Sequence, residues 1–355
     1  MSIQNAQTKG KPQLGKRFTI DGYKNDLHKY NHYIAVDWHL KKMTIARMTR
    51  KNRNPIVIDA PSDIADLQGY LKNLKGKIIL TIEETTTSQW LYVELLEYVD
   101  RIVICNPHRN RLLEDGPKND KIDAGKLCQL LGGGLVKEVY HTTDELYKLR
   151  KLERAYTTLV KSGVRLSNQK AALYRGLGKS YAKEELIDEK TEVFILGHIN
   201  NGLESYRQMK KSYESEIRKL RRKNPLLRNL CDLPGINTLL AFRIVSIVVD
   251  AYRFPTVGHY LVYCGLVKYK RESGGKNYGK RTPRYSRTLK SVYRTATEVA
   301  LLGKNPMRDY YDYLREKGVA HQNAKNAVAR YLARVSYGMM KNGTTYEPYR
   351  WRKKQ

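Results

Sequence analysis

The amino-acid sequence predicts an α/β domain, followed by a long helical segment and a second part that is mainly α-helical. Three observations support this prediction. Strand-like apolar runs alternate with amphipathic segments up to about residue 141, leucines recur at helical spacing from residue 142, and turn and helix signals dominate after residue 226. With 355 residues, the chain is long enough for two compact domains.

Five short apolar runs in the first part of the chain are expected to form β-strands, because they are rich in the residues that buried strands prefer. An amphipathic helix with Ser62 as its N-cap is predicted before the fourth strand, and a second helix before the fifth. The expected strands cover residues 33–40, 43–48, 55–58, 77–82 and 101–105, and the expected helices cover residues 62–74 and 88–98. This order favours a mixed sheet.

Apolar residues recur at spacings of three and four through residues 142–225. This pattern, flanked by many lysines and arginines, is typical of a coiled coil. Glycines and polar turns at residues 176–190 separate a first long helix from a second one expected over residues 192–222, and Pro225 marks its end. The segment is interpreted as a helical insert that joins two functional parts. A plain dimerisation hairpin is the alternative.

The chain is strongly basic, with 66 Lys and Arg against 35 Asp and Glu and a formal net charge of +31. The positive electrostatic field of such a chain attracts polyanions. It favours nucleic acid over a membrane surface as the binding partner, since no stretch approaches the ~20 apolar residues that span a bilayer. Four well-separated cysteines without a C-x-x-C pair disfavour zinc and disulfides and fit a reducing cytoplasm. Residues 1–30 are expected to be a mobile basic arm, and residues 346–355 a basic tail.

Residues 230–237 read Leu-Cys-Asp-Leu-Pro-Gly-Ile-Asn and precede an apolar helix, which resembles a helix-hairpin-helix turn. In such a turn, Gly235 and the start of the following helix present backbone N–H groups to a phosphate without reading the base sequence. A packing turn between two helices is the alternative interpretation.

Acidic residues in three segments are candidate ligands of a divalent metal ion. Asp120 and Asp123 are three residues apart, so on a helix they share one face, where two like charges cost stability unless a cation lies between them. Asp37 ends the first expected strand, and Glu83 and Glu84 follow the fourth. Such oxygen ligands suit Mg²⁺ or Mn²⁺, and two ions would stabilise both oxygens of a phosphodiester displacement. Scattered surface acids are the alternative.

A basic segment around Ser273 is a candidate phosphate-binding site. Its cations face a single acid, Glu272, so the pattern predicts a flexible loop that grips phosphates. Gly274 and Gly275 would let the backbone approach a phosphate and leave the Ser273 hydroxyl free for attack. No histidine stands beside the serine, so nearby cations or metal would have to stabilise the developing charge. The other residues expected to contact nucleic acid here are Lys276, Lys280, Arg281, Arg284 and Arg287.

These motifs, in this order, resemble the DEDD transposases of the insertion-sequence 110 family. The N-terminal match consists of Asp37 on the first strand, Glu-Glu-Thr-Thr-Thr-Ser-Gln-Trp-Leu from residue 83, Cys-Asn-Pro-His-Arg-Asn from residue 105 and Lys-Asn-Asp-Lys-Ile-Asp-Ala from residue 118. The C-terminal match consists of Leu-x-Tyr-x-Gly-Leu at residues 261–266 before Ser-Gly-Gly-Lys at residue 273. Together they cover roughly residues 30–145 and 226–340.

The resemblance implies a RuvC-like domain with a ribonuclease H fold over residues 31–141. Its metal-binding acids would be Asp37, Glu83, Asp120 and Asp123, holding Mg²⁺ or Mn²⁺. Thr86 stands where the family usually has glycine, so Glu84 remains an alternative to Glu83. The resemblance also implies a C-terminal transposase domain over residues 226–345, in which Ser273 is the nucleophile that forms a covalent link to a DNA phosphate.

The implied activity is the cutting and rejoining of DNA for the mobility of an insertion sequence. The implied partners are donor and target DNA, a structured guide RNA from the same element, and further copies of the chain in a dimer or tetramer. A site composed of Ser273 from one protomer and acids from another is one possibility. The expected location is the prokaryotic cytoplasm, at the nucleoid and away from membranes. Two alternatives are a RuvC-like metal-dependent nuclease without serine chemistry and a non-catalytic RNA-binding protein.

Overall fold

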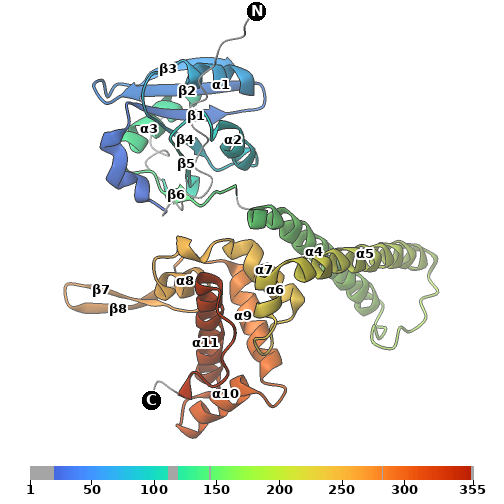
Figure 1. Cartoon of the computed structure of the whole chain (residues 1–355). Coiled ribbons are helices and arrows are strands. Elements are labelled where there is room, and N and C mark those ends of the chain that lie inside the picture. Colours follow the sequence, from blue (N-terminus) through green and yellow to red (C-terminus); the bar gives the residue numbers. More distant parts are fainter. Residues whose placement is uncertain (1–19, 111–118, 144, 282, 353–355) are drawn as a thin grey trace, which may run out of the picture. The chain divides into compact units, whose positions relative to one another are not determined.

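The structure, a computed structural model, describes residues 20–110, 119–143, 145–281 and 283–352. The chain divides into two compact units, residues 1–143 and 144–355 (Figure 1). The first unit has two hydrophobic cores, and the second has one. The second unit holds the long helices as well as the C-terminal helices, so the predicted boundary between residues 225 and 226 stays a prediction.

The first unit contains a six-stranded mixed sheet in the order β3–β2–β1–β4–β5–β6. β1 is antiparallel to β2 and parallel to β4, β4 is parallel to β5, and the outer pairs β2–β3 and β5–β6 are antiparallel. The strands are β1 (His32–Trp38), β2 (Lys42–Thr49), β3 (Ile56–Pro61), β4 (Ile78–Glu83), β5 (Arg101–Cys105) and β6 (Glu138–Val139). The predicted mixed sheet is confirmed, and only the two-residue β6 was not expected.

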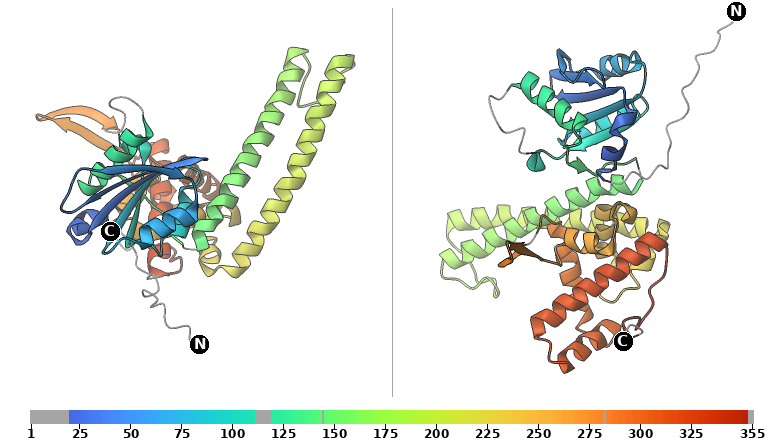
Figure 2. Two further views of the ribbon diagram at one scale, coloured as in Figure 1. Left: turned by 90° about the horizontal axis from the view of Figure 1, so that it is seen from above. Right: turned by 90° about the vertical axis from the view of Figure 1, so that its left-hand side faces the viewer.

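Helices cover both faces of this sheet (Figures 1 and 2). Tyr33 and Ala35 of β1 pack in one core with α3, whereas Ile34 and Val36 pack in a second core with α1 and α2, because successive side chains of a strand point to opposite faces. The helices are α1 (Ile64–Lys72), α2 (Ser88–Leu95) and α3 (Asp120–Gly132). The face that α3 covers is the one that matters for the candidate site.

The predicted N-cap of α1 is wrong by one residue. Asp63 is the cap, and its Oδ1 accepts hydrogen bonds from the N–H groups of Ala65 and Asp66 at 2.7 and 3.3 Å. The Ser62 hydroxyl instead donates to the carbonyl oxygen of His39 at 2.7 Å. Both residue types cap helices, but a carboxylate also interacts favourably with the positive end of the helix dipole.

The arm predicted for residues 1–30 is wrong at its C-terminal end. Gly22–Lys29 form a 3-10 helix, η1, in which Tyr23 is 2% exposed and donates its hydroxyl hydrogen bond to Val136 O at 2.8 Å. The burial of this aromatic ring holds the segment against the core beside α3, despite its polar composition. Residues 1–19 lie outside the described residues.

Two long helices, α4 (Glu145–Gly176) and α5 (Lys190–Lys223), run side by side in the segment where a helical pair is predicted (Figure 2). Gly163 of α4 is buried against Tyr206 of α5, and an added Cβ would lie 2.5 Å from that ring. The close packing of two helices around a small residue explains why this glycine stands in the interior of a helix.

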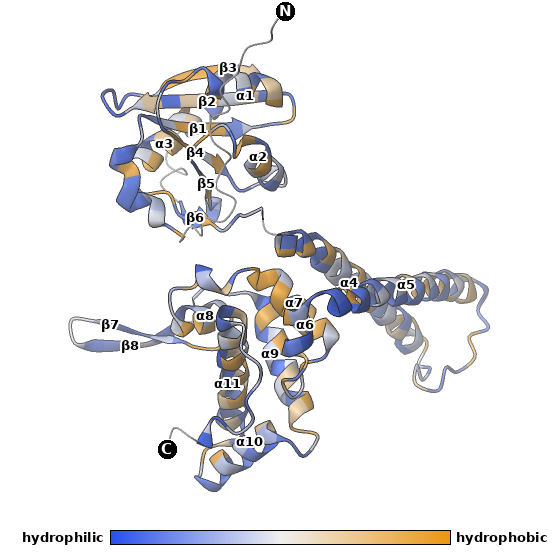
Figure 3. Cartoon of the chain, viewed as in Figure 1, coloured by the Kyte–Doolittle hydropathy of each residue, from blue (hydrophilic) through white to orange (hydrophobic). Residues whose placement is uncertain are grey.

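The remaining helices enclose one hydrophobic core. Among them, α7 consists largely of hydrophobic residues (Figure 3). They are α6 (Pro225–Leu230), α7 (Thr238–Val248), α8 (Val257–Tyr263), α9 (Arg287–Ala300), α10 (Pro306–Glu316) and α11 (His321–Asn342), with a short 3-10 helix, η4, at Ala251–Arg253. The predicted helical character of this part is confirmed. Among the described residues, no helix has the length and apolarity needed to cross a bilayer.

The basic tail predicted for residues 346–355 packs onto the fold where it is described. The Trp351 ring lies 5.1 Å from the ring of Tyr310 and 5.5 Å from that of Tyr313, measured between centroids. Trp351 and Tyr346 are partly buried against the core of the second unit. Aromatic side chains contribute large apolar area on burial, which here outweighs the neighbouring charges. Residues 353–355 lie outside the described residues.

Candidate active site

Asp37 and Glu83 occupy matching positions on two neighbouring strands. β1 and β4 are parallel, and Val36 pairs with Ile82, so the next residue along each strand is Asp37 and Glu83, respectively. Residues at matching positions of parallel strands project to the same face of a sheet. Glu84 follows one residue later, after the end of β4, and its N–H donates to Cys105 O at 2.9 Å.

That face of the sheet is the one covered by α3. Tyr33 and Ala35, which alternate with Asp37 toward the same side, belong to the core that contains Ala124 and Leu127 of α3. The register therefore favours Glu83 over Glu84 as the glutamate that faces the helix. A shift of one residue would reverse this choice, because side chains alternate along a strand.

Asp120 and Asp123 both lie in the first turn of α3. Asn119 caps this helix, since its side chain accepts a hydrogen bond from the Lys121 N–H at 3.0 Å. Two acids in a first turn are stabilised by the helix dipole, which offsets part of their mutual repulsion. The shared helical face predicted from their spacing is thus present, at the end of α3 where carboxylates are most stable.

The structure brings Asp37 and Asp120 together with a residue that the sequence reasoning missed, His39. One side-chain ligand atom from each of the three lies within 4.8 Å of the others. His39 Nε2 is 3.1 Å from Asp37 Oδ2 and 3.7 Å from Asp120 Oδ1. His39 follows Asp37 by two residues, so the Asp-x-His spacing at a strand end was the available signal.

Asp123 supplies a separate test of whether a cation fits here. Its Oδ1 is buried and, within the described residues, has no hydrogen-bond partner. A buried carboxylate oxygen without a partner is costly, and coordination to a metal ion would satisfy it. The donor set of carboxylate oxygens with one imidazole nitrogen also suits a divalent ion.

Burial and like charge act together on Asp37. Burial raises the pKa of its carboxyl above the usual value, the His39 side chain opposes the shift, and the charges of Asp120 and Asp123 add to the rise. The acids therefore repel one another in the protein without a bound cation. A divalent ion would relieve this repulsion and favour the ionised form of Asp37.

Lysines partly compensate the acid cluster at its edge. Lys42 Nζ lies 3.2 Å from Asp120 Oδ2 and 3.7 Å from Asp59 Oδ2, and Lys121 Nζ lies 3.4 Å from the same Asp59 oxygen. A hydrogen bond from Thr44 and these lysines lower the pKa of Asp59. Lys42, Thr44 and Asp59 come from β2 and β3, which the sequence reasoning did not connect with the acids.

Ser273 ends the first strand of an exposed β-hairpin, formed by β7 (Tyr269–Ser273) and β8 (Lys276–Arg281). Gly274 and Gly275 connect the strands with φ of 55° and 74°, as a type I′ turn requires. The prediction of a flexible loop is therefore wrong. The signal for a hairpin was present in the sequence, because two glycines between strand-like runs specify this turn.

All strand residues of the hairpin are exposed, and the segment carries mostly hydrophilic side chains (Figure 3). Ser273 pairs with Lys276, so a lysine stands directly across from the serine. Lys280 and Arg281 extend along β8, while Arg284 and Arg287 are exposed between the hairpin and the start of α9. The predicted basic residues thus share one exposed segment with the serine.

Gly235 has a packing role in the structure. Its φ is +81°, and an added Cβ would lie 2.0 Å from the carbonyl oxygen of Ala296 in α9. Asn237 caps α7 by accepting a hydrogen bond from the Leu240 N–H at 2.9 Å. The turn and the close approach of α9 account for this glycine, and its predicted contact with a phosphate stays a prediction.

Comparison with known proteins gives two family matches in chain order. A DEDD transposase family model of the IS110 type matches residues 26–177, and the model described as "Transposase IS116/IS110/IS902 family" matches residues 227–312. The first match contains Asp37, Glu83, Asp120 and Asp123, and the second contains Ser273.

Two curated relatives also match. An uncharacterized 43.6 kDa protein of insertion element IS110 from Streptomyces coelicolor is 27% identical over 172 residues, 46% of this chain and 42% of the relative. An uncharacterized 44.8 kDa protein of insertion element IS116 from Streptomyces clavuligerus is 29% identical over 140 residues, 39% of this chain and 35% of the relative. The matches thus span less than half the length of these relatives. With both family models matched in order, the chain belongs to the IS116/IS110/IS902 family of insertion-element transposases.

Proposed function

We propose that the chain is a transposase that cuts and rejoins DNA during the movement of an insertion element. The observation that carries this proposal is the meeting of acids from β1 and α3 on one face of the sheet, within the segment that matches the DEDD transposase model. A ribonuclease H-like fold for residues 31–141 is part of the proposal. It is supported by the strand order β3–β2–β1–β4–β5 and by the antiparallel placement of β2.

In this proposal Asp37, Glu83, Asp120 and Asp123 hold Mg²⁺ or Mn²⁺, with Glu84 as the alternative to Glu83. The bound cation would supply positive charge for the attacking and leaving oxygens of a phosphodiester displacement. His39 holds the Asp37 and Asp120 carboxylates in place from one side, and Lys42 holds Asp120 from the other. The unpartnered oxygen of Asp123 supports the assignment.

Ser273 is the proposed nucleophile. Its Oγ forms a bond to a DNA phosphorus while one P–O bond of the DNA backbone breaks, the serine proton leaves to a base, and the departing sugar oxygen takes up a proton. The product retains a phosphodiester, so the later rejoining step needs no energy source. The exposed lysine opposite Ser273 and the arginines of the same segment stabilise the charge on the phosphate.

The proposed partners are donor DNA, target DNA and a structured guide RNA, with the protein acting as a homodimer or homotetramer at the nucleoid. Residues 226–345 would form the transposase domain, joined to the first domain by residues 142–225. The net charge of +31 supports the binding of several nucleic-acid strands at once. Sequencing the nucleic acid that co-purifies with the chain tests the RNA. One discrete structured RNA is expected, and random fragments would contradict it.

Ser273→Ala tests the covalent chemistry. With a plasmid that carries the source element, the variant is expected to lose both strand exchange and the covalent protein–DNA adduct, detected by mass spectrometry of the serine peptide. Ser291→Ala, an exposed serine of α9, is the matched control and should keep both. Full activity of the Ser273→Ala variant would instead favour the second candidate, a metal-dependent nuclease that attacks with water.

Asp120→Asn tests the catalytic use of the acids. The variant keeps the side-chain shape but removes the negative charge and one of the two ligand oxygens, so cleavage is expected to fall by at least ~100-fold, as for removal of a group that stabilises the transition state. If Asp120→Asn left every activity intact, a non-catalytic RNA-binding protein would be the better description.

A further inference from the structure

A cavity of about 330 Å³ at the C-terminal end of α5 is lined by four arginines. Arg218, Arg221 and Arg222 come from the last turns of α5, and Arg228 comes from α6, which follows after a sharp turn at Pro225. All four residues are exposed. The cavity lies outside the acid cluster and outside the serine hairpin.

The charges of these arginines have no acidic ion-pair partner among the described residues. Within the described ranges, none of the four takes part in an ion pair with Asp or Glu, and the side chains of Arg218 and Arg222 have no hydrogen bond either. Arg218 is three and four residues before Arg221 and Arg222. Like charges at these spacings repel on a helix surface and destabilise it.

The helix dipole accounts for only part of this arrangement. Cations in the last turn of a helix are favourable, and Arg221, Arg222 and Lys223 occupy the last turn of α5. Arg218 lies before that turn, and Arg228 belongs to the next helix. The concentration of guanidinium groups therefore exceeds what stabilisation of α5 requires.

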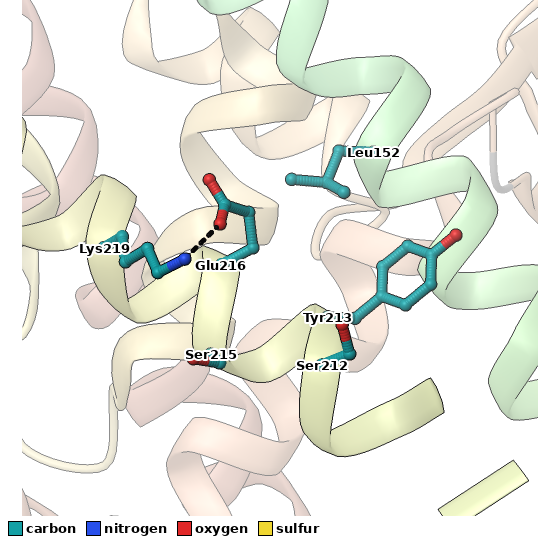
Figure 4. A pocket seen from close by; sticks show the side chains of 6 residues that line it. All are labelled: Leu152, Ser212, Tyr213, Ser215, Glu216 and Lys219. Carbon is teal, nitrogen blue, oxygen red and sulfur yellow. Dashed lines mark hydrogen bonds and ion pairs between the residues drawn. The ribbon is translucent and has the colours of Figure 1, made fainter. Parts of the chain in front are cut away.

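A second hollow that also involves α5 differs from the arginine cavity in its charge (Figure 4). It is lined by Leu152, Ser212, Tyr213, Ser215, Glu216 and Lys219. There the single cation, Lys219, pairs with Glu216 at 3.1 Å, so the hollow carries no net charge. Among the described residues, the lining of the arginine cavity has four positive side chains and no acid.

Three hydrogen bonds hold the cavity in shape. Arg228 donates from Nη1 to the carbonyl oxygen of Arg222 at 3.2 Å, which fixes a guanidinium from α6 beside the end of α5. Arg221 Nη1 lies 3.4 Å from Thr238 Oγ1, at the first residue of α7. Asn224 caps α6 by accepting from the Leu227 N–H at 3.2 Å and stabilises the turn between the helices. A ligand would meet groups that are already partly ordered.

We propose that this cavity binds a phosphate of a nucleic-acid backbone, as an anchor that contains none of the proposed reacting groups. Guanidinium groups bind phosphate oxygens through paired, charge-assisted hydrogen bonds, and four of them offer enough donors for the oxygens of one or two neighbouring phosphates. Contacts to phosphate oxygens carry no sequence information, so the anchor is expected to bind independently of base sequence. The proposal rests on the proposed function only for the presence of nucleic acid; DNA and RNA share the recognised chemistry.

The test compares two double variants of the full chain. Arg218→Gln/Arg222→Gln removes two cavity charges whose side chains form no hydrogen bond or ion pair in the described part of the chain. Lys161→Gln/Arg165→Gln is the control, because it removes an exposed pair of cations at the same four-residue spacing on α4. Binding of a labelled DNA duplex and of an RNA duplex of the same sequence is measured over a series of salt concentrations.

The cavity variant is expected to bind one or both duplexes on the order of 10-fold more weakly, because charge-assisted hydrogen bonds to phosphate are removed. Its plot of log affinity against log salt should be flatter by roughly 0.9 for each phosphate of a DNA duplex that the variant no longer neutralises. The control should keep the wild-type slope. Neither variant should lower the melting temperature without nucleic acid, since both relieve like-charge repulsion.

Equally weakened binding in the two variants would overturn the proposal, because it would show a diffuse positive field. The proposal would also fail if the cavity variant kept wild-type binding, or if inorganic phosphate stabilised wild type alone while duplex binding stayed unchanged. Formation of the Ser273 adduct by the wild-type chain is measured separately. If wild type forms the adduct but the cavity variant binds nucleic acid like wild type, only the phosphate anchor is refuted. If the cavity variant shows the flatter salt dependence but wild type forms no adduct, only the proposed activity is refuted.

Discussion

At the scale of single residues, the acid cluster combines groups that destabilise one another unless a cation is bound. Burial and the charges of Asp120 and Asp123 raise the pKa of Asp37. A folded-state pKa above the unfolded value means that the folded protein binds this proton more tightly. The resulting stability is present at low pH and is lost as the pH rises through the raised pKa of Asp37.

Asp37→Asn is therefore expected to raise the melting temperature of the metal-free protein at neutral pH, because it removes a charge that burial and Asp120 disfavour. In wild type, Mg²⁺ should raise the melting temperature at neutral pH and have little effect below the pKa of Asp37, since ion binding needs the carboxylate. Thermal denaturation with a chelator and with Mg²⁺ measures both effects. A lower melting temperature of the metal-free variant would contradict the repulsion that we infer.

At the scale of secondary-structure elements, α4 and α5 owe their close packing to a glycine. An added Cβ at Gly163 would lie 2.5 Å from the Tyr206 ring, a distance that real Cβ atoms essentially never show, so the ring or the helices would have to shift. Gly197 of α5 has no atom within 4 Å of an added Cβ. The two glycines thus separate a packing effect from the intrinsic preference of a helix for alanine.

Gly163→Ala is expected to destabilise the second unit by about 1–3 kcal/mol, as for overpacking of a tight core. Gly197→Ala should stabilise the same unit by about 0.5–1 kcal/mol, because glycine in a helix costs this much relative to alanine. Chemical denaturation of the two variants gives both values. A loss of stability in Gly197→Ala, or none in Gly163→Ala, would show that the packing of Tyr206 on Gly163 is not what limits the approach of the helices.

The hairpin that carries Ser273 also depends on a specific turn. Both Gly274 and Gly275 have positive φ, which other residues adopt at a cost. Gly275→Val is expected to lower formation of the Ser273 adduct strongly while the melting temperature changes little, because the hairpin is exposed and contributes no core. Gly318→Val, at an exposed positive-φ position outside the hairpin, is the control and should leave adduct formation unchanged.

At the scale of the whole molecule, the chain carries separate hydrophobic cores in its two units. The cores of residues 1–143 lie on the two faces of the sheet, and the core of residues 144–355 joins the helices around α7 and α9. Each unit can therefore unfold as a cooperative block, and a ligand that binds one unit stabilises that block first.

Calorimetry of the full chain is expected to show two transitions, of which Mg²⁺ raises only the one that belongs to the first unit. Asp123→Asn should abolish this shift without moving the other transition, because the acids lie in the sheet unit alone. A single transition, or an Mg²⁺-dependent shift of the transition assigned to the helical unit, would contradict the assignment of metal binding to these acids.

Local sequence patterns were sufficient to predict most of the fold. The strands from β1 to β5, both helices on the α1–α2 side and the helical second unit follow from apolar periodicity, which depends on neighbouring residues alone. The errors lie where a contact between distant residues determines the local structure. Burial of Tyr23 against Val136 orders part of the expected arm, and Trp351 packs on Tyr310 in the expected tail. Neither contact has a local signal.

The residues of the candidate site also fall into those that local sequence patterns predicted and those that only the tertiary structure brought together. Spacing and family motifs identified Asp37, Asp120, Asp123 and Ser273 in the sequence, because each belongs to a short recognisable segment. The preference for Glu83 over Glu84, the presence of His39 beside Asp37, and the arginine cavity depend on strand register and on helix packing. The strand register and the meeting of His39 with Asp120 arise from contacts between residues far apart in the chain, and the cavity arises from the turn between two helices, so the sequence patterns did not reveal them.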